Sequence, residues 1–577
     1  MSRGQRTLPV SQLHRELTVK VNGEPVPRSQ HLLSASISAP VNKIASAKLV
    51  YQDGAAATGE FHLLNDNLFA QGNTIEILAG GSDDSTLIFS GIVVAQRIKL
   101  REDSAPQLIV TCKHAAIKAT LTKNGRYFEE QSDSDIIQSL LQEYSLLAEV
   151  EATSVTHKQL VQYDCSDWDF CLQRAMANGL VIFTRGDQLE ITAPDLSGDP
   201  VCNLEFGATL LSADLETDAR TQASSYKNPF WDSSEQTLSE PEGESNLEAM
   251  PGNTEPSALA DNLGGAEAVL RQAAEQEAEA QQQADAERQY AELSRVNGTL
   301  KSQGIATVNP GDVVQLSGLG DAFNGNALVT GVRHETDRVS GWRSYFQVGG
   351  LDAIAAKPST KSSATAEIVS GLQIAIVVSN EDPDNEFRVK LRLPLLNNES
   401  DGIWARIASL DAGDDRGLMI RPEVDDEVIV GFVQGDPRKA VVLGMLHSSA
   451  HPAPEQPSDD NHIKLLKTRS GLLLKLDDEN SELTLETPNG NRLKLTDQEP
   501  GLVLEDESDN RLVLNADGIQ IESAGDISFS ATGNISLEAD SNIELKASAN
   551  FSAEGSAGID INSSAVTNVK GSLVKLN

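Results

Sequence analysis

Residues 518–565 read GIQIESAG, DISFSATG, NISLEADS, NIELKASA, NFSAEGSA and GIDINSSA, which are six consecutive blocks of eight residues. The second and fourth positions of each block are apolar, the sixth is small, and the last is Gly, Ser or Ala. An apolar period of two predicts a short strand with one buried face, and a turn residue at every eighth position predicts a bend. A fixed repeat of this kind is typical of a β-solenoid.

A block of this length offers too little apolar surface for one chain to enclose a core. A single-chain solenoid needs roughly 20 or more residues per repeat, whereas three chains with one eight-residue face each can close a triangular prism. Each chain would also cover the strand edges of its neighbour. The repeat therefore predicts an intertwined homotrimer. Its axial core would consist of Ile519, Ile521, Ile527, Phe529, Ile535, Leu537, Ile543, Leu545, Phe551, Ile559 and Ile561.

Two other structures are compatible with an acidic repeat, namely a flat meander with exposed edges and a disordered tail. Both apolar columns stay in phase over six blocks, which favours the trimer. Residues 462–517 alternate apolar and polar residues less regularly, and we interpret them as a wider start of the same solenoid. The whole solenoid would then span 462–577.

The charge balance excludes several classes of partner. The chain has 577 residues, enough for roughly three to five domains. It carries 46 Lys and Arg against 85 Asp and Glu, a formal net charge of −39. Nucleic-acid binding depends on basic contacts to phosphate, and anionic membranes also attract basic segments. The sequence therefore predicts neither nucleic-acid binding nor binding to anionic membranes, and we interpret the acidity as a source of solubility.

No residue pattern points to catalysis, a cofactor or a metal. The four cysteines lack metal-ligand spacing and are expected to be buried free thiols: Cys112, Cys165, Cys171 and Cys202. The histidines closest to one another along a Pro-rich stretch have no cysteine partner and are interpreted as loop residues: His447, His451 and His462. Glycine-rich stretches lack the Lys-Ser/Thr ending of a phosphate loop. We expect a protein that is not an enzyme.

The first residues, MSRGQRTLPVSQLHRELTV, contain no apolar segment of signal-peptide length. We therefore expect synthesis in the cytoplasm without a signal peptide. Strands are predicted at 16–21, 47–51, 74–78, 87–100 and 107–112, as in a β-barrel. Helices are predicted over 134–144 and from Ser166, which can cap the second helix before Gly179 ends it.

The middle of the chain changes composition twice. Residues 232–264 are acidic and rich in Pro, Gly and Ser, which predicts an exposed loop or linker. Residues 265–293 are rich in Ala, Gln and Glu and predict a helix, followed by strands up to about residue 355. A linker is predicted at 356–367. Five short strands within 368–449 fit an OB-type barrel, and 450–461 read as a Pro-rich connector.

The stretch from Asp382 to Gly444 resembles the OB-fold module of the VgrG family of spike proteins. The matching pieces are Asp382-Pro383, Arg388-Val389, Trp404-Ala405-Arg406, Ala412-Gly413, Pro422-Glu423-Val424, Asp426-Glu427-Val428 and Gly435-Asp436-Pro437. The SDWDF run, the GDVVQLSG and FNGNALVTGVRHE runs and the C-terminal blocks follow the order of the same family. Asp425 stands where that family usually has Gly, and we expect this difference to affect a turn.

The resemblance implies a mainly β protein built as a fused phage baseplate hub and spike. The predicted order is a first hub β-barrel (1–120), a helix-containing α+β region (121–231), an acidic loop (232–264), a helix with the second hub β-barrel (265–355), a linker (356–367), an OB-fold collar (368–449), a connector (450–461) and a triple-stranded intertwined β-helix needle (462–577).

The resemblance also implies a function and partners. Such a homotrimer is the central spike of a contractile injection machine, and it adapts a six-fold tube to a three-fold needle that punctures a target envelope. Its partners would be the inner tube protein, baseplate proteins, the target membrane in passing, and a small PAAR-like protein that caps the needle at Val574, Leu576 and Asn577. Free phage-tail-like particles, phages and cell-anchored type VI secretion systems share these parts. The alternative function is a trimeric β-helical tailspike that binds or cleaves surface polysaccharide.

Overall fold

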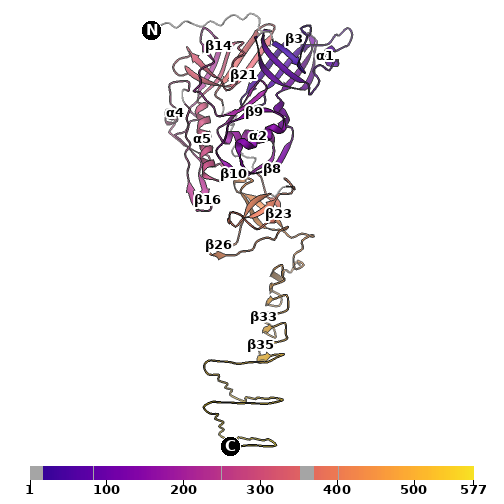
Figure 1. Cartoon of the computed structure of the whole chain (residues 1–577), viewed down its shortest axis with the longest axis vertical. Coiled ribbons are helices and arrows are strands. Elements are labelled where there is room, and N and C mark those ends of the chain that lie inside the picture. The colour runs from indigo at the N-terminus through magenta and orange to yellow at the C-terminus, as the bar shows by residue number, and fades with distance from the viewer. Residues whose placement is uncertain (1–16, 82–83, 248–249, 351–368, 400–401, 577) are drawn as a thin grey trace. The chain divides into compact units, whose positions relative to one another are not determined.

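The computed structural model describes residues 17–81, 84–247, 250–350, 369–399 and 402–576, so the predicted linker at 356–367 lies outside the described residues. The chain folds into two compact units, Met1–His447 and Ser448–Asn577. Within the first unit we call residues 17–217 and 296–350 the hub and residues 369–447 the collar (Figure 1). As predicted, the protein is mainly β.

The hub is organised by one 13-stranded sheet. Its first half holds β1 (Leu17–Val21), β2 (Glu24–Pro25), β3 (Leu32–Pro40), β4 (Ser46–Gln52), β5 (Thr74–Gly81), β6 (Asp84–Arg101) and β7 (Ser104–Lys113), with the short helix α1 (His62–Asn65). Its second half holds β13 (Cys202–Glu205), β14 (Leu210–Thr217), β19 (Val296–Gln303), β20 (Val313–Ser317), β21 (Gly325–Asp337) and β22 (Gly341–Val348). Each half has its own apolar core.

Two hub barrels are predicted, at 1–120 and 265–355, whereas the two halves share one sheet because β3 pairs with β21 in antiparallel register. The second half also begins earlier than predicted. Strands β13 and β14 precede residue 265, yet they pair with β20 and β19. These long-range pairings leave no local signal in the sequence, so the α+β region predicted for 121–231 ends sooner than expected.

Between the halves lies the predicted α+β region. It contains a 3₁₀ helix (Ala115–Thr120), β8 (Lys123–Ser132), α2 (Asp133–Glu143), β9 (Leu147–Val150), β10 (Thr156–Ser166), α3 (Asp167–Ala177), β11 (Val181–Arg185) and β12 (Gln188–Thr192). The Ser166 side chain accepts from the amide of Asp169 and caps α3, as the sequence predicts. Gly179, which follows the helix, has φ +73°, a left-handed conformation that glycine adopts without strain.

The predicted loop at 232–264 contains regular structure. Residues 218–295 leave the sheet after β14 and return to it at β19, and we call them the excursion. It contains β15 (Ser225–Lys227), β16 (Phe230–Asp232), β17 (Thr237–Ser239), α4 (Pro256–Asn262), β18 (Glu267–Val269) and α5 (Glu277–Leu293). The helix predicted from 265 thus starts later, because residues 267–269 pair with β15.

The collar is a closed five-stranded barrel, as predicted. Its strands are β23 (Gln373–Ser379), β24 (Val389–Arg392), β25 (Ile403–Ile407), β28 (Glu427–Phe432) and β29 (Ala440–Met445), with the small hairpin β26 (Ala412–Gly413) and β27 (Arg416–Gly417) and a 3₁₀ turn (Val433–Gly435). Asp425 has φ +73°, a left-handed conformation in which Gly is the least strained residue. The difference at this position therefore lies in a turn, as expected.

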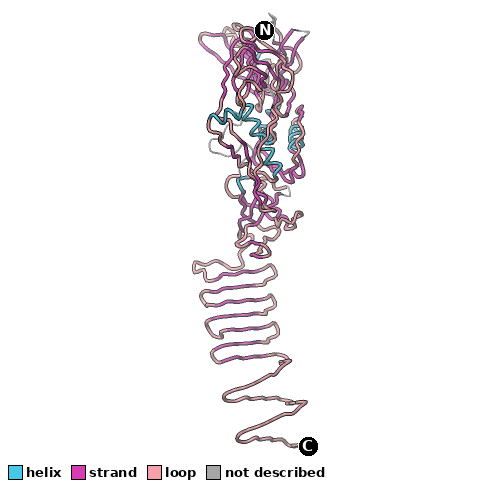
Figure 2. Tube along the Cα trace, turned by 90° about the vertical axis from the view of Figure 1, so that its left-hand side faces the viewer, coloured by secondary structure: helices cyan, strands magenta, loops and turns pink. Residues whose placement is uncertain are grey.

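The second unit begins with an antiparallel meander rather than a solenoid. Its strands are β30 (Ile463–Lys467), β31 (Leu473–Asp477), β32 (Glu482–Glu486), β33 (Arg492–Thr496), β34 (Leu502–Glu505), β35 (Arg511–Asn515) and β36 (Gly518–Glu522). Each strand pairs with the next one in the chain, which Figure 2 shows as successive rungs. Among the described residues that follow, 523–576 form no strand within the chain.

Candidate functional site

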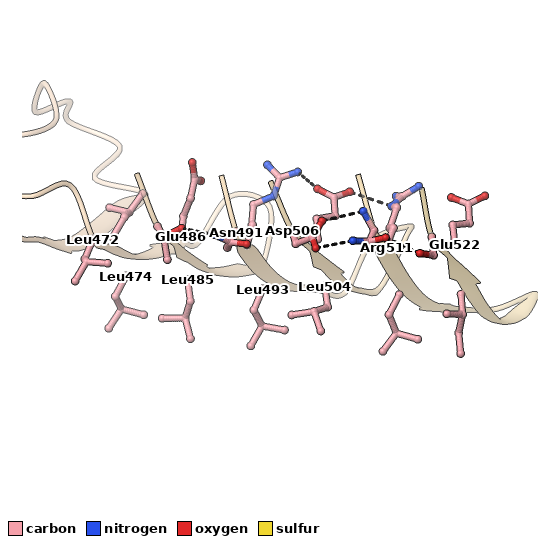
Figure 3. A pocket seen from close by; sticks show the side chains of 18 of the residues that line it. Leu472, Leu474, Leu485, Glu486, Asn491, Leu493, Leu504, Asp506, Arg511 and Glu522 are labelled. Atoms are coloured by element: carbon pink, nitrogen blue, oxygen red, sulfur yellow. Dashed lines mark hydrogen bonds and ion pairs between the residues drawn. The ribbon is translucent and has the colours of Figure 1, made fainter. Parts of the chain in front are cut away.

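The seven-stranded sheet of the second unit carries two continuous apolar columns on one face. The strand register places Leu474 opposite Leu485, Leu485 opposite Leu493, and so on along the sheet. The first column runs Leu466, Leu474, Leu485, Leu493, Leu504, Leu512 and Ile521, and the second runs Leu476, Leu483, Leu495, Leu502, Leu514 and Ile519. Figure 3 shows Leu474, Leu485, Leu493 and Leu504 pointing the same way from successive strands. We call these thirteen side chains the leucine face.

The leucine face is open to solvent in the single chain. Leu466 is 48% exposed, Leu485 42% and Leu504 49%, and exposure rises to 71% at Ile519. Monomeric proteins rarely expose a contiguous apolar patch that extends over so many strands. A surface of this kind marks an interaction site.

The opposite face of the same sheet is charged and internally paired. Lys494 Nζ lies 2.5 Å from Glu482 Oε2, and Arg492 and Arg511 both contact Glu505. The stems of these long side chains cover the centre of the face, where Val503 is only 3% exposed. The charged face of the sheet therefore forms ion pairs within its own chain, whereas the leucine face stays open to solvent.

The octad columns begin in β36 with Ile519 and Ile521 and continue beyond the sheet, and they too are open to solvent. All eleven residues predicted for the axial core are exposed, with values from 51% at Ile527 to 78% at Ile561. Among the described residues 523–576, no backbone group hydrogen-bonds to another backbone group. Both the apolar side chains and the backbone of this segment are thus available to a partner.

The predicted tip-contact residues lie in the last described turn of the chain. Val574 is 49% exposed and Leu576 is 92% exposed, while Asn577 lies outside the described residues. Neither described side chain packs against an apolar cluster of the structure. Their role as a tip contact stays a prediction.

The leucine face is the part of the site that sequence reasoning missed. Its signal is present as Leu pairs at two-residue spacing, for example Leu474 with Leu476 and Leu493 with Leu495. The spacing between successive pairs alternates with the turn lengths, so it does not form a fixed repeat. A search for a constant period therefore finds the octads and passes over the meander.

Burial raises the pKa of Cys112 to about 12 and that of Cys202 to about 11, so neither thiol ionises near neutral pH. Three of the cysteines are buried and Cys202 is half-buried. Within the described ranges, no group of three or more His, Cys, Asp or Glu residues could hold a metal ion. In the same ranges no helix is both long and apolar enough to cross a membrane.

Three features together define a spike protein of the VgrG type. They are a hub with two apolar cores on one sheet, a closed five-stranded collar, and a repetitive C-terminal unit with open apolar columns. The chain belongs to the family of the Alg8 N-terminal domain, whose family model matches residues 11–337, and it is a VgrG-family spike protein. Residues 373–447 match the type VI secretion system/phage-baseplate injector OB domain.

Curated relatives match over shorter stretches. The type VI secretion system spike protein VgrG3 of Vibrio cholerae is 34% identical over 110 residues, which are 18% of this chain and 11% of that protein. VgrG1a of Pseudomonas aeruginosa is 27% identical over 183 residues, 29% of this chain and 28% of the relative. The matches thus span less than a third of the length of these relatives.

A solved structure shares the fold over most of the chain. This structure is a chain of the Francisella PdpA–VgrG complex, which matches with a TM-score of 0.52 and 11% sequence identity. The alignment covers 85% of this chain and 79% of that chain.

Proposed function

We propose that three copies of this chain assemble into the central spike of a contractile injection machine. The observation that carries the proposal is that no side chain of the leucine face is buried and that the octad columns are exposed. Burial of one Leu or Ile side chain stabilises an assembly by about 1.5–3 kcal/mol. Many such side chains on each of three chains would outweigh the repulsion between three copies that each carry −39.

The two parts of the C-terminal unit would contribute to the trimer in different ways. The meander is already paired within its own chain, so three meanders would pack with their leucine faces toward a common axis. The octads after β36 have no pairing of their own, so they would hydrogen-bond to the neighbouring chains and bring Ile527, Ile535 and Ile543 to the axis. The shaft would then have a dry core and a continuous backbone ladder, which together give stiffness.

The hub would join this three-fold shaft to a six-fold tube. Each chain has two sheet halves with separate cores, so three chains would present six similar lobes in a ring. The partners at that ring would be the inner tube protein and the baseplate. The solved relative was determined as a PdpA–VgrG complex, which is consistent with a spike that works within a larger assembly.

The shaft would act mechanically outside the producing cell. With strand layers about 4.8 Å apart, the segment from Ile463 onward would give a needle on the order of 70 Å. That length exceeds a bilayer of about 40–45 Å including its headgroups. Sheath contraction would supply the work, and the chain would catalyse no reaction. A small PAAR-like protein would cover the open end at Val574 and Leu576.

The experiment that tests the proposal is the native mass of the purified full chain, combined with electron microscopy. We expect a mass of three times 61.8 kDa and a thin rod at one end of each particle. A monomer of 61.8 kDa at micromolar concentration would contradict the proposal. A trimer with a thick shaft that binds or degrades surface polysaccharide would support the tailspike alternative instead.

A further inference from the structure

The excursion begins and ends at the same place on the hub sheet. Thr217 and Val296 are partners at one end of the β14–β19 ladder, although residues 218–295 separate them in sequence. A simple hairpin would connect these strands with a few residues. The chain instead follows a long path that reaches the collar and comes back, so the excursion has a role other than connecting β14 to β19.

Glu279 on helix α5 of the excursion lies between two arginines from different parts of the first unit. Its Oε1 lies 3.5 Å from Nη2 of Arg174 in the hub. Both of its carboxylate oxygens accept from Nη1 of Arg438 in the collar, at 2.9 Å and 3.1 Å. One carboxylate therefore contacts the hub and the collar at once.

Each arginine has a second acidic partner on its own side. Arg174 donates to both oxygens of Asp133, at 2.6 Å and 2.9 Å, and Arg438 donates from Nη2 to Asp436 at 2.9 Å. The side chains form an alternating series, Asp133–Arg174–Glu279–Arg438–Asp436, which we call the charge chain. All five side chains are at most 5% exposed.

All five members of the charge chain stay ionised despite their burial. Burial would raise the pKa of Glu279, but the charges of Arg438 and Arg174 outweigh it and hold that pKa below its ordinary value. Burial would likewise raise the pKa of Asp133, but the charge of Arg174 outweighs it and lowers that pKa. His157 Nε2 lies 3.0 Å from Asp133 Oδ2, so the imidazole ring also contacts the hub end of the charge chain.

Other contacts follow the same path across the unit. Gln276 of the excursion donates to the carbonyl of Thr156 in the hub, and the Lys439 ammonium of the collar lies 6.0 Å from the Phe230 ring of the excursion. Hub and collar also touch directly, because the Trp404 amide donates to Gln159 Oε1. That amide reports on whether the two parts stay together.

We propose that the excursion fastens the collar to the hub, with Glu279 as the residue that joins Arg174 to Arg438. Loss of one partner from a buried ionic group leaves an uncompensated charge, whereas an apolar replacement of both partners is often tolerated. The excursion would thus make the hub and the collar move as one body. The inference concerns contacts within one chain and does not require the trimer.

The test compares Glu279→Gln with Glu277→Gln, an exposed position on the same helix. Hydrogen exchange is measured on the peptide that carries Trp404. We expect the Trp404 amide to exchange at least tenfold faster in the E279Q chain, while E277Q leaves it unchanged and the barrel-core strand β29 stays protected in both. Unchanged exchange at Trp404 in folded E279Q chain would overturn the proposal.

A double substitution keeps the test informative if E279Q folds poorly. In a chain that already carries Asp436→Asn, so that no buried carboxylate loses its arginine, Glu279→Met combined with Arg438→Met removes both charges of the central pair, while Arg174 keeps Asp133. We expect the double variant to show Trp404 exchange within threefold of the D436N chain, and each single Met variant to show faster exchange. If the two single effects simply add in the double variant, the residues act independently and the proposal fails.

Discussion

Arg388 donates from Nε and Nη2 to both carboxylate oxygens of Asp382, at 3.0 Å and 2.8 Å. The same carboxylate accepts from the backbone amides of Glu386 and Asp384, and its side chain is 4% exposed. Replacement by Asn removes the charge that these donors share. We expect Asp382→Asn to destabilise the collar by about 2 kcal/mol, measured by urea unfolding of the full chain.

The matched control for this variant is Glu381→Gln, at the adjacent exposed position. It changes the formal charge by the same amount without touching the loop's hydrogen bonds. We expect a change of less than about 0.5 kcal/mol. Equal effects at the two positions would mean that the collar responds to net charge rather than to the Arg388 contact.

The pH dependence of stability should reveal the same carboxylate. The hydrogen bond from Arg388, together with the amide donors, holds the pKa of Asp382 well below its usual range. A folded-state pKa below the unfolded value gives stability that is present above about pH 4 and is lost as the pH falls further. We expect the difference in unfolding free energy between the unmodified chain and D382N to be constant from pH 7 to 5 and to shrink below pH 4. A difference that grows on acidification would contradict this assignment.

The leucine face should tolerate no charge at its centre. We expect Leu493→Lys to abolish the trimer, because three ammonium groups would meet in an apolar environment at a cost of several kcal/mol each. The measurement is sedimentation equilibrium of the full chain, with 61.8 kDa as the monomer mass. Gln520→Lys places the same charge on the opposite, charged face and should leave the trimer intact.

One charged side chain in the octad columns should be enough to destabilise the shaft. Ile543→Asp would bring three carboxylates to the proposed axis, whereas Ser541→Asp adds the same charge at a block boundary. We expect the first variant to lower the melting temperature of the shaft by at least 10 °C and to expose residues beyond 543 to protease. The second should behave like the unmodified chain. Equal protease resistance of the two variants would place Ile543 outside a core.

The end of the shaft should bind its cap through apolar side chains. Val574 and Leu576 alternate with Lys575, so a strand would place the lysine on the other face. We expect Val574→Glu with Leu576→Glu to reduce co-purification of a co-expressed PAAR-like protein at least tenfold. Lys575→Glu should have no effect. Binding that survives the double substitution would locate the cap elsewhere.

The sequence predicts best those elements that carry their own boundary signals. Ser166 caps α3 and Gly179 follows its end, and both features are read from residue type and spacing alone. The five strands of the collar barrel likewise lie within the predicted range 368–449, because each has a short alternating pattern between turn residues. In these cases the residues within and next to an element are sufficient to predict it.

Features that depend on distant partners were not predicted. Residues 202–217 read as part of the α+β region because nothing in their sequence identifies β19 or β20 as partners. Residues 232–264 of the excursion read as a loop or linker because their acidic composition is typical of exposed chain, whereas backbone hydrogen bonds such as that from Gly243 to the carbonyl of Tyr226 hold them in place. The charge chain has the same origin, since its members lie up to several hundred residues apart in sequence.

The contrast between the meander and the octads implies an order of assembly for the proposed trimer. A newly made chain can complete β30 to β36 alone, because each of these strands finds its partner a few residues away. In the proposed trimer, the residues after Glu522 would pair only when the other copies arrive. Three preformed sheets that meet first would fix the stagger of the chains, and the later blocks would then wind together from that end without slipping by an octad.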